Sequence, residues 1–466
     1  MRQLLIVKKI TDMKKKLIVS ILLMVNLCLY QTGNLLAQEN DVQEKVDDYI
    51  EVYMQMNQFS GSVLVANNGN VLVSKGYGYA NYQFNIENKS QTKFRIASLT
   101  KGFTAVAIMQ LVENNKLSLE DKLIKFIPDF PRGDEIKIYH LLSMTSGIPN
   151  HTEFDDFNKE RRVFHYSILQ TIETFKGKPL EFSPGEQFKY SNSNYMLLGF
   201  IIEHVSDMTY AEYVKQNIFE PLKMQNSGYE TPEKIIINMA QGYRFKNNEI
   251  ENAKFRNMAN AHASGALYST IEDLYIWDRA LYTDKLVSKK SLETMFSTVK
   301  ANYAFGWGVV DVFNHKMIAH AGEIDGFTTN ISRFIDDDIC IIILSNFEHT
   351  PISRITKDLI AIIFDKEYKN PDVVKTTKLP DEVLQSYTGE YELKPGFVFT
   401  VTFNDVGRLY CQPTGQPKLE LMPLSEYEFV LKEVEARISF IKGSNQMIEK
   451  LILHQRGNEI PASKIK

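Results

Sequence analysis

The chain has 466 residues, 44% hydrophobic and 24% charged, a balance typical of globular proteins with about two or three domains. This composition excludes a disordered, collagen-like or multi-span membrane protein. The 53 Lys and Arg against 57 Asp and Glu give a net charge of −4, without the clustered basic excess of nucleic-acid-binding proteins. Three cysteines exclude a disulfide scaffold and a multi-thiolate zinc site.

The first forty residues have the plan of a secretory signal peptide. Lys14, Lys15 and Lys16 precede an apolar run over residues 17–29, and small and polar residues then lead to Ala37. The run is shorter than the ~20 residues that span a bilayer. We expect residues 1–37 to be removed, leaving no stable membrane span, and the protein to be exported to the periplasm or the medium.

Two alternatives remain open for this segment. One is a retained membrane anchor. The other is a lipoprotein modified at Cys28, although residues 25–27 lack the small residue expected just before a lipidated cysteine. Met13, directly before the lysines, is an alternative start. Cleavage after Ala37 leaves Cys340 and Cys411, which fall in separate predicted domains, so we expect no disulfide between them.

The mature chain begins with strand patterns and changes to helical ones. Ser62 to Tyr79 alternates around Asn-Asn-Gly-Asn at 67–70, which predicts a hairpin. Residues 98–282 have helical patterns, and residues 304–347 contain four β-rich runs. Strands at both ends with helices between them indicate an α+β domain over residues 40–365. We expect one antiparallel sheet flanked by helices, plus a helical subdomain.

A second domain follows a short linker. Residues 366–380 are charged and contain Pro371 and Pro380, as linkers often do. Residues 381–466 show short strands separated by turns at regular spacing, which predicts a small antiparallel β-barrel or sandwich.

A Ser-x-x-Lys pattern opens the long apolar helix that begins at Ser98. Positions i and i+3 share a helix face, so Lys101 can reach the Ser98 hydroxyl. Burial disfavours an ammonium and brings an amine towards the neutral form that acts as a base. The backbone N–H of Ser98, at a helix N-terminus, can help to hold an oxyanion. Ser98 as a simple N-cap and Lys101 as a solvated lysine remain the alternative.

Tyr190 and Asn192 lie on a loop that runs into a second apolar helix. Tyr190 can relay a proton if neighbouring cations lower its pKa from ~10. Asn192 offers a donor and an acceptor to a substrate amide. A turn tyrosine and a helix-capping asparagine are the alternative.

The third element is His320-Ala321-Gly322, on a predicted strand. A small residue followed by glycine lets a substrate backbone lie against the strand edge. The backbone amide of Glu323 is the candidate for a second oxyanion donor. A structural role for His320 is the alternative.

Together, the three elements resemble the serine β-lactamase and penicillin-binding-protein superfamily, specifically its class C β-lactamase, DD-peptidase and esterase branch. Longer segments around them are similar as well: residues 94–98, 140–147, 190–195 and 263–270. The resemblance extends over roughly residues 45–365. Tyr-Thr-Gly-Glu-Tyr at 387–391 and the residues after it resemble the lipocalin-like accessory domain of some members.

The resemblance implies a β-lactamase/transpeptidase-like fold and an acyl-serine hydrolase without metal or cofactor. Its catalytic residues are then Ser98, Lys101 and Tyr190. The substrate is held by Asn192, His320 and Gly322, and the amides of Ser98 and Glu323 form the oxyanion hole. The expected partner is a small-molecule or peptide substrate, not a nucleic acid.

One departure from the family bears on the substrate. Many β-lactamases have Lys-Thr-Gly where this chain has His320-Ala321-Gly322. Histidine is mostly neutral at pH 7, so recognition of a β-lactam carboxylate is expected to be weaker and pH-dependent. We therefore expect DD-peptidase, D-aminopeptidase or esterase activity rather than efficient β-lactam hydrolysis. Glu323 stands where the branch often has glycine, and it can crowd or charge the site.

A non-hydrolytic protein of the same fold that binds penicillin or a wall peptide is the rival hypothesis. The chain has no His-Glu-x-x-His, Gly-x-Ser-x-Gly or Walker-type glycine motif to support other chemistry. The loops expected to wall the pocket, residues 150–162 and 229–260, carry no readable substrate code. The oligomeric state and the role of the C-terminal domain stay open.

Overall fold

The computed structural model describes residues 41–157, 161–246, 249–371, 377–404, 407–416, 418–431, 436–444, 447–455 and 458–466. The predicted signal peptide, including Cys28, lies outside these residues. The chain divides into two compact units between residues 371 and 372. Among the described residues, no helix has both the length and the apolar character needed to cross a bilayer.

The first unit is built on an antiparallel sheet with the strand order β10-β11-β12-β13-β1-β2. Its strands are β1 (Gly61–Asn67), β2 (Asn70–Tyr77), β10 (Gly308–Val312), β11 (His315–Ile324), β12 (Phe327–Phe334) and β13 (Ile339–Ser345). The predicted hairpin is β1 and β2. It joins the C-terminal strands because β1 pairs with β13, from Gly61 opposite Ser345 to Asn67 opposite Ile339. Both ends of the domain thus form one sheet, which confirms the α+β prediction.

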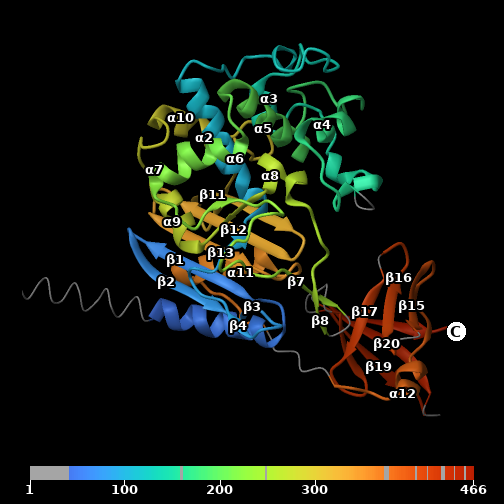
Figure 1. The fold of residues 1–466 in the computed structure, drawn as a ribbon. Coiled ribbons are helices and arrows are strands. Elements are labelled where there is room, and N and C mark those ends of the chain that lie inside the picture. Colours follow the sequence, from blue (N-terminus) through green and yellow to red (C-terminus); the bar gives the residue numbers. More distant parts are fainter. Residues whose placement is uncertain are drawn as a thin grey trace, which may run out of the picture. The chain divides into compact units, whose positions relative to one another are not determined.

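Both faces of this sheet are covered (Figure 1). Successive side chains of a strand point to opposite faces, so Val63 and Val65 enter one hydrophobic cluster and Leu64 and Ala66 the other. The first cluster packs under the helix over residues 41–55 and under α11 (Ile352–Ile363). The helical part of the unit covers the second.

Most helices of the first unit come from the middle of the chain. The α-helices are α2 (Thr100–Glu113), α3 (Ile138–Leu142), α4 (Ile168–Lys176), α5 (Asn192–Ser206), α6 (Tyr210–Val214), α7 (Glu220–Leu222), α8 (His262–Gly265), α9 (Ile271–Ala280), α10 (Lys289–Met295) and α11 (Ile352–Ile363). Short 3₁₀ turns are η1 (Ala97–Leu99), η2 (Leu123–Lys125), η3 (His151–Glu153) and η6 (Met258–Asn260), and a π-helical turn is η5 (Lys215–Phe219). Helix α2 is buried on nearly every side, as its apolar sequence predicts, and ends at Asn114.

A small three-stranded sheet has the strand order β5-β9-β6. It consists of β5 (Phe94–Arg95), β6 (Gly228–Tyr229) and β9 (Leu267–Ser269). Two further pairs are β3 (Tyr79–Asn81) with β4 (Ile86–Glu87), and β7 (Tyr243–Lys246) with β8 (Glu249–Asn252). Strand β5 runs directly into η1, so this small sheet sets the position of Ser98.

The second unit is a closed antiparallel barrel of eight strands, which confirms the predicted barrel. Helix α12 (Asp381–Ser386) precedes the strands β14 (Gly389–Lys394), β15 (Phe397–Phe403), β16 (Leu409–Pro413), β17 (Leu419–Pro423), β18 (Glu428–Leu431), β19 (Ala436–Lys442), β20 (Ile448–Gln455) and β21 (Asn458–Lys464). The barrel closes where Tyr391 pairs with Lys464. Its interior is packed with aromatic rings; Tyr387 stacks on Phe440 with 4.5 Å between centroids.

Candidate active site

Ser98 lies in a strained turn rather than in the first turn of the long α-helix. It is the middle residue of η1, and α2 begins at Thr100. The preceding residue, Ala97, has φ of +47°, a left-handed conformation that costs free energy in a residue with a Cβ. Ser98 remains half-buried. The turn therefore presents the hydroxyl at the protein surface next to the start of α2.

Lys101 is completely buried, and its amine has three polar neighbours. Nζ lies 2.9 Å from Ser98 Oγ, 2.9 Å from Asn192 Oδ1 and 2.8 Å from the carbonyl oxygen of Ser264. Among the described residues, no carboxylate forms an ion pair with it. Burial without a counter-ion holds the pKa of Lys101 well below its usual range.

The neighbours also orient the neutral amine. A neutral amine has two N–H groups and one lone pair. The oxygens of Asn192 and Ser264 are acceptors only, so they take the two N–H groups. The third direction, towards Ser98 Oγ, is left for the lone pair, and the Ser98 hydroxyl can donate to it. This arrangement suits proton abstraction from serine.

Tyr190 contacts the same hydroxyl from the other side. Its OH donates to Ser98 Oγ at 3.0 Å, and its ring centroid lies 5.0 Å from Lys101 Nζ. Burial raises the pKa of Tyr190 and outweighs the hydrogen bond to Ser98, which lowers it. The condition set for a proton relay, a tyrosine pKa lowered by neighbouring cations, is therefore not met, since burial is the larger influence. Tyr190 holds its proton and acts as a donor.

Asn192 is held in one orientation by two residues at the start of η3. Its backbone N–H donates to Asn150 Oδ1 at 3.0 Å, and its side-chain Nδ2 donates to Thr152 Oγ1 at 3.1 Å. Because the amide nitrogen is occupied by Thr152, the amide oxygen faces Lys101. The residue expected to contact substrate thus also positions the lysine.

His320 lies on β11 at the edge of this cluster. Its ring is 6.2 Å from that of Tyr190, and its Nε2 lies 3.3 Å from the hydroxyl of Tyr303. Nδ1 contacts the Ala321 carbonyl, which only accepts, so Nδ1 carries the proton and Nε2 accepts from Tyr303. Desolvation and the nearby Lys101 lower the pKa of His320 to about 3.

The low pKa corrects one expectation about His320. A histidine with a pKa of about 3 stays neutral from pH 5 to 8, so it supplies no positive charge to a substrate carboxylate in that range. The predicted weakness of carboxylate recognition follows. The predicted pH dependence through this residue does not.

Gly322 has a structural role in addition to the substrate contact that its motif suggests. A Cβ at this position would lie 2.7 Å from the Ile96 carbonyl oxygen and 2.9 Å from Ser98 N. Both are backbone atoms, so a side chain has no room here. Glycine is required because the nucleophile turn packs directly against β11. Glu323 is the next residue on the strand, and its side chain is exposed.

The structure brings all the predicted site residues into one region, and it adds others that sequence reasoning missed. Ser264 contributes a main-chain oxygen, Tyr303 supports His320, and Thr152 with Asn150 fixes Asn192. Two signals pointed to these regions without a role for each residue: the similarity of residues 263–270 to the family, and the expectation that residues 150–162 wall the pocket. Within the described residues, no cluster of three His, Cys, Asp or Glu side chains could hold a metal ion.

Comparison with known proteins identifies the same family. The model of the family described as Beta-lactamase matches residues 46–363. Penicillin-binding protein 4* of Bacillus subtilis (strain 168) is 32% identical over 443 residues, which cover 89% of this chain and 97% of that protein.

Solved structures agree on the fold. The octameric penicillin-binding protein homologue from Pyrococcus abyssi has a TM-score of 0.65 at 26% identity and covers 90% of this chain and 99% of its own. The D-amino acid amidase from Ochrobactrum anthropi SV3 has a TM-score of 0.62 at 20% identity, covering 71% of this chain and 99% of its own. The protein therefore belongs to the beta-lactamase family and is a serine hydrolase of the β-lactamase and penicillin-binding-protein superfamily.

Proposed function

We propose that the protein is an exported hydrolase that forms an acyl-serine intermediate on small amides, D-amino-acid peptides or esters. The observation that carries this proposal is the placement of Ser98 Oγ between Lys101 Nζ at 2.9 Å and the Tyr190 hydroxyl at 3.0 Å. One neighbour can take the serine proton while the other can give a proton to the leaving group. Export rests on the signal-peptide pattern of residues 1–37.

In the proposed reaction, the Ser98 proton moves to the lone pair of Lys101 as Oγ bonds to the substrate carbonyl carbon. The carbonyl oxygen becomes an oxyanion, held by the backbone N–H groups of Ser98 and Glu323. The C–N or C–O bond breaks, and Tyr190 gives its proton to the departing nitrogen or oxygen. The Lys101 ammonium returns a proton to Tyr190, which leaves a neutral site and an acyl-Ser98. Water then releases the acid by the reverse sequence.

The neutral His320 favours substrates that do not depend on a carboxylate at that position. Uncharged amides and esters lose nothing against a neutral imidazole, whereas a β-lactam carboxylate gains no ionic partner from it. We therefore place D-aminopeptidase and esterase substrates ahead of β-lactams. DD-peptidase substrates end in a carboxylate of their own, which likewise gains no ionic partner from His320. Asn192 and His320 contact the substrate in this proposal.

A substrate panel with wild type and Ser98→Ala tests the proposal: p-nitrophenyl esters, D-amino-acid amides, D-Ala-D-Ala peptides and nitrocefin. We expect turnover of an ester or amide that Ser98→Ala abolishes, and a fluorophosphonate adduct on Ser98 by intact mass. Turnover of nitrocefin alone would overturn the preferred substrate class. Ligand binding without turnover that persists in Ser98→Ala would support the rival, a non-hydrolytic binding protein.

A further inference from the structure

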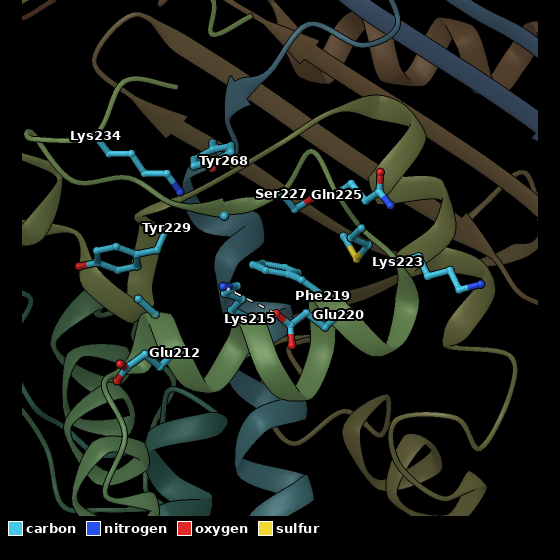
Figure 2. Close-up of a pocket in the computed structure, with 13 residues that line it drawn as sticks. Glu212, Lys215, Phe219, Glu220, Lys223, Gln225, Ser227, Tyr229, Lys234 and Tyr268 are labelled. Carbon is cyan, nitrogen blue, oxygen red and sulfur yellow. Dashed lines mark ion pairs between the residues drawn. The ribbon is translucent and has the colours of Figure 1, made fainter. Parts of the chain in front are cut away.

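A cavity of about 500 Å³ opens in the first unit among residues that the active site does not use. Its walls come from α6, η5, α7 and the small sheet, together with the loop that carries Lys234 (Figure 2). The volume falls within the ~300–1,000 Å³ of small-molecule sites. The η5 segment is a π-helical turn, a rare conformation that is frequent at functional sites.

The floor of this cavity is aromatic and firmly built. Phe219 and Tyr268 are 4% and 5% exposed, and Tyr229 completes the wall. A Cβ on Gly228 would lie 2.4 Å from the Tyr268 hydroxyl, so the tyrosine rests directly on the glycine backbone. Such a floor suits a ring-sized apolar group.

The rim carries an excess of positive charge. Of the five charged residues that line the cavity, Lys215 pairs with Glu220 at 3.7 Å, and the Glu212 carboxylate accepts from Thr209. Lys223 and Lys234 form no ion pair among the described residues. Figure 2 shows Lys234 directed towards Tyr268 and Lys223 directed away from the aromatic side chains. Lys234 is thus the cation available to a ligand on the aromatic floor.

The strand behind the floor is tied to the catalytic turn. Leu267, next to Tyr268 on β9, accepts from Ile96 N at 3.0 Å and donates to Thr100 Oγ1 at 3.3 Å. These two hydrogen bonds flank Ser98 on either side. Four residues before Tyr268, the Ser264 carbonyl accepts from Lys101. Tyr268 is therefore linked through its own strand to both the nucleophile turn and the oxygen that orients the base.

A second connection runs from Tyr229 through His262. The Tyr229 ring lies 5.9 Å from that of His262, whose Nε2 contacts the Glu203 carboxylate at 3.2 Å. His262 has φ of +37° and begins α8, the helix that contains Ser264. A strained residue held by packing and one side-chain contact is a point where a small shift changes the backbone beyond it.

We propose that this cavity is a second binding site, for a small molecule with a ring-sized apolar body and one anionic group, and that its occupancy changes the acylation rate of Ser98. The ring lies on Phe219 and Tyr268 and the anion meets Lys234. The claim that the cavity binds such a ligand is independent of the proposed function. The claimed effect on acylation rests on the proposed function.

Binding is tested on the full-length mature chain with the fluorescent anion 1-anilinonaphthalene-8-sulfonate, displaced by 4-phenylbutyrate. The uncharged 4-phenylbutanol is the ligand control. We expect saturable binding that weakens about tenfold in Lys234→Ala, the loss of one charge-assisted contact, and disappears in Ala211→Trp, which fills the cavity. Lys223→Ala, which removes the same charge from a side chain directed away, should bind within about twofold of wild type.

Equal affinity in all variants, equal losses in Lys223→Ala and Lys234→Ala, or equal displacement by the alcohol would overturn the site. Circular dichroism and melting curves check that each variant is folded. Fluorophosphonate labelling of Ser98 with and without saturating 4-phenylbutyrate tests the effect on the active site, and an unchanged rate in wild type would overturn it. If no labelling occurs at all, the proposed function fails. Hydrogen exchange at residues 262–268, measured with and without 4-phenylbutyrate, then tests the coupling between the cavity and the nucleophile turn. Unchanged exchange would reject this coupling.

Discussion

Lys101 Nζ lies 2.8 Å from the carbonyl oxygen of Ser264, a residue 163 positions further along the chain. That main-chain acceptor and Asn192 Oδ1 take both N–H groups of the neutral amine, which leaves the lone pair towards Ser98. The direction of the base is therefore set from outside its own helix. Many proteins have a lysine three residues after a serine. The two acceptors from Asn192 and Ser264 are what distinguish Lys101 from such lysines.

Substitution of Lys101 should nearly abolish acylation. In Lys101→Met, Ser98 loses its proton acceptor, so we expect fluorophosphonate labelling to slow by about 10²–10⁴-fold, the usual contribution of a general base. Rates of adduct formation by intact mass measure this. Lys300→Met is the matched control, since Ser297 and Lys300 have the same spacing and Lys300 is exposed. Similar rates in the two variants would contradict the assignment of the base.

The buried amine should also make the free energy of unfolding depend on pH. Burial lowers the pKa of Lys101 in the folded protein, whereas the unfolded chain binds the proton up to a pKa of ~10.4. The unfolded state thus binds more protons in this window, and the free energy of unfolding of wild type should rise with pH relative to Lys101→Met, by up to about 1.4 kcal/mol per pH unit. Urea unfolding of both proteins from about pH 7 to about pH 10 measures the difference. A constant difference would show that the amine is protonated in the folded state.

Gly322→Ala should impair catalysis through the nucleophile turn. Its Cβ would lie 2.9 Å from Ser98 N, so Ser98 must move, and a displacement of about 1 Å at a reacting group costs up to about 10²-fold in rate. Gly308→Ala on the neighbouring strand is the control, because its nearest contact would be 3.5 Å away. Ester hydrolysis rates of folded variants compare the two. Unimpaired Gly322→Ala would mean that the turn adjusts freely.

Replacement of His320 by lysine should restore recognition of carboxylates. A cation at this position adds a charge-assisted contact, so we expect kcat/KM for nitrocefin to rise about tenfold in His320→Lys. The neutral p-nitrophenyl esters should not gain, and they serve as the internal control. An equal gain for both substrates would indicate a general change of the site rather than a new ionic contact.

Titration of His320 should not contribute to the pH dependence of kcat/KM in wild type. Because the pKa of His320 is about 3, the ring is neutral throughout pH 5–8 and its titration cannot shape activity there. The variant His320→Gln should therefore keep the midpoint of the acid limb of kcat/KM. A limb near pH 6.5 that vanishes in this variant would refute the low pKa.

The pattern of the sequence predicted the elements and the three motifs because both depend on local periodicity and residue type. The hairpin of β1 and β2, the buried helix α2 and the C-terminal barrel follow from such signals. The Ser264 contact could not be predicted, because a backbone carbonyl has no residue-type signature. The pKa shifts of Tyr190 and His320 were also out of reach, since burial depends on what packs around each ring.

Gly322 is a second case in which the sequence pattern does not reveal a contact between distant segments. The motif predicted a glycine that lets substrate lie against the strand, and the structure adds that the backbone of Ile96 and Ser98 excludes a Cβ at this position. Contacts between segments more than two hundred residues apart are not encoded in either segment alone.

The pairing of β1 with β13 has a consequence for biosynthesis. On one side β1 pairs with its hairpin partner β2, but on the other side Gly61 pairs with Ser345 of β13. An emerging polypeptide therefore exposes this second edge of β1 until nearly the whole domain has left the ribosome. Such long-range closure slows folding. An incomplete chain thus lacks the central pairing of its sheet, a property that would suit the export proposed above.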